Sequence, residues 1–259
     1  GIMGKMLSFE MHKLFRTKSF YIWTAVSVAL SLIYLLISYG MVQALSSVPE
    51  MAAMYPGETG IISVMGMFAK SPMVMCLLLF VCGFVCTDFE NNILKNVVSK
   101  GFKRTTIFTA KYITCIFAAL VMTVLNAVCV FGVSTMLFGS AGQFYSLFVP
   151  QLILLIVGIF AFAGFDFMFC AVFKKIAPAI VLSILALLVL PTGLNALNAA
   201  ISKKPEWLDF NAFWLGGAES NLANVNITVN GLLAAAVCIV VYLVITYVVS
   251  MAAVRKMEV

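Results

Sequence analysis

The stretch that decides the fold is residues 86–111, which read CTDFENNILKNVVSKGFKRTTIFTAK. This stretch is polar, lies between two apolar segments, and carries two acidic and five basic residues. Thr87 and Glu90 have the S/T-x-x-E spacing of a capping box, and Asp88 adds negative charge where a helix dipole favours it. The pattern therefore predicts that a helix begins at Thr87.

Apolar residues in the same stretch recur at helical spacing. Phe89, Ile93 and Val97 fall on one face of a helix. Lys100 follows in the last turn, and Gly101 is a residue that readily takes the left-handed conformation at a helix C-terminus. We therefore expect an amphipathic helix of about three turns, whose apolar stripe a protein or a lipid surface must cover.

The composition indicates an integral membrane protein. Hydrophobic residues make up 63% of the 259 residues and charged residues 10%, whereas soluble domains are about half apolar and a quarter charged. All seven cysteines lie in or at the ends of apolar segments, so the sequence suggests no disulfide framework. His12 is the only histidine, so we expect no metal site.

Six apolar segments are long enough to cross a bilayer, which requires about 20 residues. We place them at about 19–40, 65–86, 106–138, 147–173, 177–200 and 230–254. The first is too long for the usual apolar region of a signal peptide, so we expect a retained helix. Pro191 and Gly193 predict a kink or a break in the fifth. The sequence thus predicts an all-α integral membrane protein with six transmembrane helices.

Residues 3–18 predict an amphipathic helix that lies in the membrane interface. Apolar residues recur there at helical spacing, and basic residues occupy mostly other positions. Such a helix buries its apolar face at the headgroup level while its cations reach anionic lipids. The lipid bilayer is therefore the first partner that we expect.

The distribution of basic residues predicts the orientation. With six spans, both termini lie on one side, and thirteen of the sixteen Lys and Arg residues fall on that side. The positive-inside rule then places both termini in the cytoplasm. Because this rule accounts for the excess positive charge, we expect no binding to nucleic acid.

The segment between the second and third spans resembles a loop of a known family. An acidic residue after a span, then ENNILKN, then GFKRTTIFTAK before the next span are similar to the cytoplasmic loop of ABC-2-type permeases. These are the membrane subunits of ABC exporters, and the resemblance covers essentially the whole chain. It implies that the coupling loop, residues 87–104, docks into an ATP-binding subunit and that the chain lies in a bacterial plasma membrane.

The resemblance also implies partners and a substrate. Two ATP-binding subunits would hold ATP and Mg, and a second permease, identical or related, would complete the transporter. The substrate would be a membrane-active peptide or another hydrophobic or amphipathic molecule, such as a drug or a lipid. The residues that the resemblance assigns to docking are Asp88, Phe89, Glu90, Ile93, Leu94, Lys95, Lys100 and Arg104. Residues 3–18 would contact the ATP-binding subunit as well, or serve only as an anchor.

The predicted extracellular segment 201–229 is rich in aromatic residues. Trp207, Phe210, Phe213 and Trp214 lie near Gly216 and Gly217, a composition typical of the membrane interface or of a short re-entrant helix. The ABC-2 resemblance implies an outer gate made of re-entrant helices. An ordinary aromatic belt is the alternative.

Polar residues inside the predicted spans are candidates for a translocation path. Asp166 is the one carboxylate there, and an ionisable group at that depth is costly enough to suggest a function. It could attract a cationic substrate, pair with a lysine, carry a proton, or act as a structural partner near the interface. Asn126 could line the path or form an interhelical hydrogen bond.

The sequence lacks several catalytic motifs. It contains no G-x-x-x-x-G-K-[ST] phosphate loop, no G-x-S-x-G and no H-E-x-x-H. We therefore expect that the chain is not an enzyme, holds no cofactor itself, and depends on a separate subunit for ATP hydrolysis. A self-sufficient secondary transporter is the alternative.

Overall fold

The computed structural model describes residues 1–48, 58–70, 72–91, 93–201, 205 and 208–256. All regular structure in these residues is helical. The helices are α1 (Ile2–Arg16), α2 (Lys18–Ser46), α4 (Gly60–Lys70), α5 (Met73–Glu90), α6 (Ile93–Val98), α7 (Arg104–Phe138), α8 (Phe148–Phe173), α9 (Ile176–Ala200), the 3-10 helix η1 (Phe210–Phe213), α10 (Leu215–Leu222) and α11 (Val229–Arg255).

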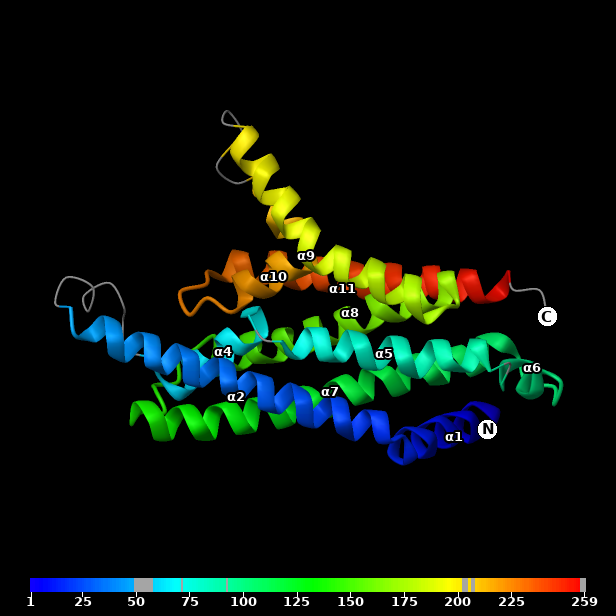
Figure 1. Ribbon diagram of the computed structural model, residues 1–259. Coiled ribbons are helices and arrows are strands. Elements are labelled where there is room, and N and C mark those ends of the chain that lie inside the picture. The colour runs from blue at the N-terminus through cyan, green and yellow to red at the C-terminus, as the bar shows by residue number, and fades with distance from the viewer. Residues whose placement is uncertain (49–57, 71, 92, 202–204, 206–207, 257–259) are drawn as a thin grey trace.

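Six of these helices are long and apolar enough to cross a membrane, namely α2, α5, α7, α8, α9 and α11. The protein is an all-α multi-pass membrane protein, so the predicted fold class is confirmed. The N-terminus, α6 and the end of α11 lie at one end of the bundle (Figure 1). We call this the α6 end, and the other end, which carries α4 and α10, the α10 end.

The second predicted span consists of two helices. A single helix over 65–86 was expected, but α4 ends at Lys70 and α5 begins at Met73 with Pro72 as its N-cap. Proline lacks a backbone N–H and disfavours helical conformation in the residue before it, which explains the break. Most of the α4 side chains that the structure describes are buried, including Ile61, Met65 and Phe68, so α4 belongs to the core.

Helix α8 packs closely against both α7 and α11. At Gly164 of α8, an added Cβ would come within 2.5 Å of the Tyr112 hydroxyl on α7 and 2.9 Å of the Thr246 hydroxyl on α11. The missing side chain therefore lets the three helices approach one another, as small residues do in membrane bundles.

Helix α9 is continuous through Pro191 but bends away from the bundle (Figure 1). The kink that the sequence predicted is thus present, and a break is not. Proline removes one hydrogen bond of the helix and its ring clashes with the preceding turn, which accounts for a bend. The exposed apolar side chains of α9 include Leu188, Val189 and Leu197.

The predicted helix of the coupling loop begins later than expected. Helix α5 continues to Glu90, and the Thr87 hydroxyl donates a hydrogen bond to the Gly83 carbonyl instead of capping a new helix. The expected start at Thr87 is therefore wrong, because the capping-box residues form the last turn of α5. Gly101 has φ +87°, the left-handed conformation that the sequence predicted.

Candidate functional site

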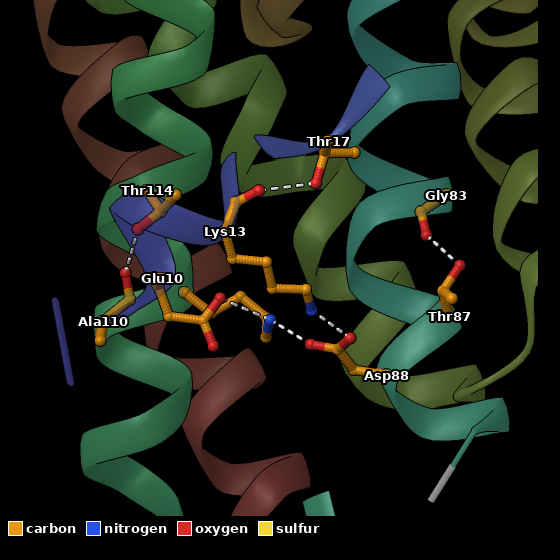
Figure 2. A network of polar contacts seen from close by, with 9 residues as sticks. Glu10, Lys13, Thr17, Gly83, Thr87, Asp88, Ala110 and Thr114 are labelled. Carbon is orange, nitrogen blue, oxygen red and sulfur yellow. Dashed lines mark hydrogen bonds and ion pairs between the residues drawn. The ribbon is translucent and has the colours of Figure 1, made fainter. Parts of the chain in front are cut away.

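A network of four charged side chains joins α1, α5 and α7 near the α6 end (Figure 2). Lys111 of α7 donates to Glu10 Oε2 of α1 at 2.8 Å and also to Asp88 of α5. Lys13 of α1 donates to the second carboxylate oxygen of Asp88. We call these four residues the ion network.

The ion network is largely shielded from solvent. The side chain of Lys111 is 0% exposed, those of Asp88 and Glu10 are 3% exposed, and only Lys13, at 28%, reaches the surface. The Phe84 ring lies 4.9 Å from Lys111 Nζ and 5.2 Å from Lys13 Nζ, close enough for cation–π attraction. Two positive and two negative charges balance, as burial of charge requires.

A small apolar cluster fastens α6 to the same two helices. Met6 of α1 and Ile107 and Ala110 of α7 are buried there, and Val97 and Val98 of α6 pack against them. Val97 and Val98 of α6 are therefore covered by the chain's own α1 and α7. Together the ion network and this cluster make α1, α6 and the adjoining ends of α5 and α7 one connected unit.

Three of the residues assigned to docking make contacts inside the chain. Asp88 is buried in the ion network, where its carboxylate binds two lysines and is not exposed to a docking partner. Phe89 is half-buried and its ring packs 5.3 Å from that of Phe108. Glu90 Oε1 accepts a hydrogen bond from the Ile176 backbone N–H at 3.1 Å, at the start of α9.

The remaining docking candidates lie on or beside α6. Lys100 is exposed, whereas Ile93 and Arg104 are half-buried. The side chains of Leu94 and Lys95 lie outside the described part of the chain. Exposed polar residues on this side include Asn96 and Ser99. Among the described side chains of α6 and of the turn that follows it, the exposed ones are therefore polar.

Asn126 ties two spans together. Its amide donates to the Ser27 hydroxyl at 2.9 Å and to the Met122 carbonyl at 2.8 Å, and its carbonyl accepts from the Ser31 hydroxyl at 2.8 Å. Asn126 is fully buried between α2 and α7. The structure therefore favours the interhelical hydrogen bond over a place in a translocation path.

The aromatic segment before α11 folds onto the bundle at the α10 end. Trp214 is only 4% exposed, and its ring packs against Phe165 and Tyr242 at centroid distances of 5.5 and 5.9 Å. Phe210 and Phe213 lie in η1, and Phe213 is exposed. Trp207 lies outside the described residues. Of the three predicted gate residues that the structure describes, Trp214 is the buried one.

Two cavities lie next to Trp214. The larger, about 460 Å³, lies between α9 and α10 and is open to the outside; we call it the α9–α10 cavity. The smaller, about 10 Å³, is lined by Asp166 and Ser183. Both cavities share the side chains of Val74, Phe162, Leu187 and Trp214 as walls.

Asp166 is 3% exposed and belongs to α8. It faces the smaller cavity, which is about large enough for one water molecule. No ion pair of Asp166 with Lys174 or Lys175 is present among the described residues. The structure therefore places Asp166 beside a cavity rather than in a structural salt bridge.

The chain was compared with models of protein families. A family model described as a protein of unknown function, DUF2705, matches residues 51–259. The chain belongs to the DUF2705 family. The matched residues include Asp88 and Lys111 of the ion network, but not Glu10 and Lys13. They also include all of the residues that line the two cavities. A search of curated proteins gave no match to this DUF2705 protein.

Sequence reasoning missed Lys13 and Lys111 as the cations that pair with Asp88, and Glu10 as the second partner of Lys111. Each lies at the edge of an apolar segment, where a charge commonly reaches water or lipid headgroups. The available signal was the presence of opposite charges at three neighbouring segment ends on the same predicted side of the membrane. Glu219, which borders the larger cavity, was also missed because its segment was predicted to be a loop.

Proposed function

We propose that this protein is the membrane-spanning permease subunit of an ATP-driven ABC exporter, located in the plasma membrane with both termini in the cytoplasm. The ATP and Mg would be bound by two copies of a separate ATP-binding subunit, and a second permease would complete the transporter. The observation that carries the proposal is that the apolar cluster fastens the short helix α6 to α1 and α7, and that the ion network joins these two helices to α5.

Such a connection suits the transmission of force from a neighbouring subunit. A short helix held only by a flexible loop would yield when pushed, whereas α6 is packed against α1 and α7. Because Lys111 bonds to both α1 and α5, displacement of α6 would move three helices together. Switching between packed arrangements of this kind is how small local shifts become domain motions.

A second connection leads from the coupling loop to α9. The Glu90 carboxylate accepts from the backbone N–H of Ile176, and carboxylates are favourable at helix N-termini. Helix α9 then runs to the α9–α10 cavity, which Leu187, Pro191 and Asn195 line. Movement at Glu90 would therefore be transmitted along α9 to a cavity at the opposite end of the bundle.

The cargo that we propose is hydrophobic or amphipathic, with a membrane-active peptide as the first choice. The walls of the α9–α10 cavity include aromatic side chains, and α9 and α11 expose long apolar faces. Such surfaces suit apolar cargo or a second permease copy.

Photocrosslinking from α6 tests the proposal. A crosslinking amino acid would replace exposed Asn96 on α6 or, as a matched control, exposed Asn226 at the α10 end. We expect a protein with a phosphate-binding loop to be crosslinked at position 96 in living cells and not at position 226. Equal capture at both positions, or capture of no ATP-binding protein at position 96, would contradict the proposal.

A self-sufficient secondary transporter is the second candidate. It is favoured by the position of Asp166, a carboxylate inside the bundle beside a cavity, because such groups commonly carry protons or coupling ions. Transport that continues after depletion of ATP and stops when the proton gradient is dissipated would support this candidate. Transport that follows the ATP level would exclude it.

A further inference from the structure

The α9–α10 cavity is lined by polar and acidic residues together with aromatic rings. Asp209 and Glu219 are its two acidic lining residues, and none of the lining residues in the described part of the chain is basic. Phe68, Phe162 and Trp214 are its aromatic lining residues. The cavity therefore combines acidic groups with aromatic rings.

Unpaired polar atoms gather around this cavity. Glu219 is only 1% exposed, and neither of its carboxylate oxygens has a hydrogen-bond partner among the described residues. The indole N–H of Trp214 is also buried without a partner there. Buried polar groups in folded proteins are nearly always paired, so such a group points to a missing partner.

The position of Glu219 is fixed by α8. Its carboxylate lies against Gly158, where an added Cβ would collide with it. The absence of a side chain at Gly158 leaves the space that the carboxylate occupies between α8 and the cavity. Burial raises the pKa of Glu219 well above its ordinary value. A nearby positive charge would offset this cost of burial.

The chemistry of a fitting ligand follows from these groups. An organic cation would supply the opposite charge that Glu219 lacks, and its positive charge would also be attracted to the face of the Trp214 ring. The apolar part of such a molecule would lie against Phe68 and Phe162. The cavity volume of about 460 Å³ lies in the range of pockets that bind small organic molecules, so it accommodates such a cation. An anion would meet two carboxylates and no cation among the described lining residues.

We propose that the α9–α10 cavity is a binding site for lipophilic organic cations, with Glu219 as the counter-ion and Trp214 as part of the aromatic wall. Amphipathic molecules with an ammonium or guanidinium group belong to this class. The site goes beyond the proposed function, because its affinity for cations does not depend on an ATP-binding subunit.

Binding of two probes of equal shape and opposite charge tests the site. Tetraphenylphosphonium and tetraphenylborate would be titrated by equilibrium dialysis against the purified chain in lipid nanodiscs, with empty nanodiscs to correct for partition into lipid. We expect saturable binding of tetraphenylphosphonium at one site per chain and no saturable binding of tetraphenylborate. Equal binding of both probes, or saturable binding of neither, would overturn the proposal.

A pair of matched variants then assigns the charge. Glu219→Gln keeps the shape of the side chain and is expected to weaken tetraphenylphosphonium binding by at least about tenfold, equivalent to one ion-pair contact of about 1.4 kcal/mol. Glu58→Gln changes a carboxylate that bonds to Ser38 in a different cavity and should leave the affinity unchanged. Unaltered binding by Glu219→Gln would contradict the assignment, and loss of binding in both variants would do so too.

The test remains decisive if Glu219→Gln does not fold. The comparison of the two probes needs only the wild-type chain, and Trp214→Phe provides a second variant that keeps an aromatic ring. This variant is expected to weaken tetraphenylphosphonium binding about threefold or more, since Trp attracts cations better than Phe. Unchanged affinity would remove Trp214 from the site.

Discussion

Substitution of Asp88 by Asn is the most informative perturbation of the ion network. The four charges of Glu10, Lys13, Asp88 and Lys111 balance in the wild-type chain. Asp88→Asn keeps the shape of the side chain but leaves one positive charge in excess. Because the Lys111 side chain is 0% exposed, water cannot solvate that charge. Removal of one partner from a buried ion pair costs about 3–5 kcal/mol, so we expect a loss of that size in the free energy of unfolding.

A second substitution distinguishes charge balance from a general loss of packing. Lys13→Met alone leaves one negative charge in excess, and we expect it to cost about 1–3 kcal/mol. The double variant retains only the Glu10 and Lys111 pair, which is neutral. Its cost should therefore fall below the sum of the single costs by about 0.5–3 kcal/mol.

Equilibrium unfolding in mixed detergent micelles measures these energies. The purified variants would be titrated with sodium dodecyl sulfate and followed by circular dichroism, with Lys100→Met as a control because Lys100 is exposed. We expect this control to change the unfolding free energy by less than about 0.5 kcal/mol. Strictly additive costs in the double variant, or an Asp88→Asn chain as stable as the wild type, would refute the reasoning.

Three further predictions concern other contacts. Asn126→Ala removes two hydrogen bonds between α2 and α7 and one within α7. It should lower the unfolding free energy by about 1–2 kcal/mol in the same titration. A loss below about 0.3 kcal/mol would contradict the structural role of Asn126. Gly164→Ala should cost about 1–3 kcal/mol because its Cβ meets two hydroxyls, whereas Gly193→Ala, with nothing within 4 Å, should be neutral or stabilising. Equal effects of the two alanines would count against the close packing of α8. Glu90→Ala should reduce transport by the proposed exporter several-fold while ATP hydrolysis continues, and unchanged transport would exclude the connection to α9.

The sequence predicts the number and approximate limits of the spans well because twenty apolar residues in a row have few alternatives. It predicts the bend in α9 from Pro191 and the left-handed Gly101 from local backbone chemistry. It is wrong about the start of the coupling helix, since the same four residues, 87–90, suit a capping box and the end of a long helix. The neighbouring apolar residues of α5 favour continuation, and tertiary packing decides the outcome.

The ion network could not be predicted because its four residues come from three different helices, α1, α5 and α7. Lys13 and Lys111 are separated from Asp88 by 75 and 23 residues, and Glu10 is separated from Lys111 by 101. Their pairing depends on how α1 lies against α5 and α7. The break at Pro72 likewise brings α4 into the core, which periodicity alone does not indicate. The two cavities and the isolated Glu219 arise only when α9 and α10 are placed beside α8.

The central claim, that this chain is the permease of an ATP-driven exporter, is tested most directly by the mass of its native complex. The chain would be isolated from its own cells in mild detergent, after gentle crosslinking, and its complex measured by native mass spectrometry. The account predicts two permease chains together with two copies of a protein that carries a phosphate-binding loop. A monomer or dimer of this chain without any ATP-binding protein would contradict it.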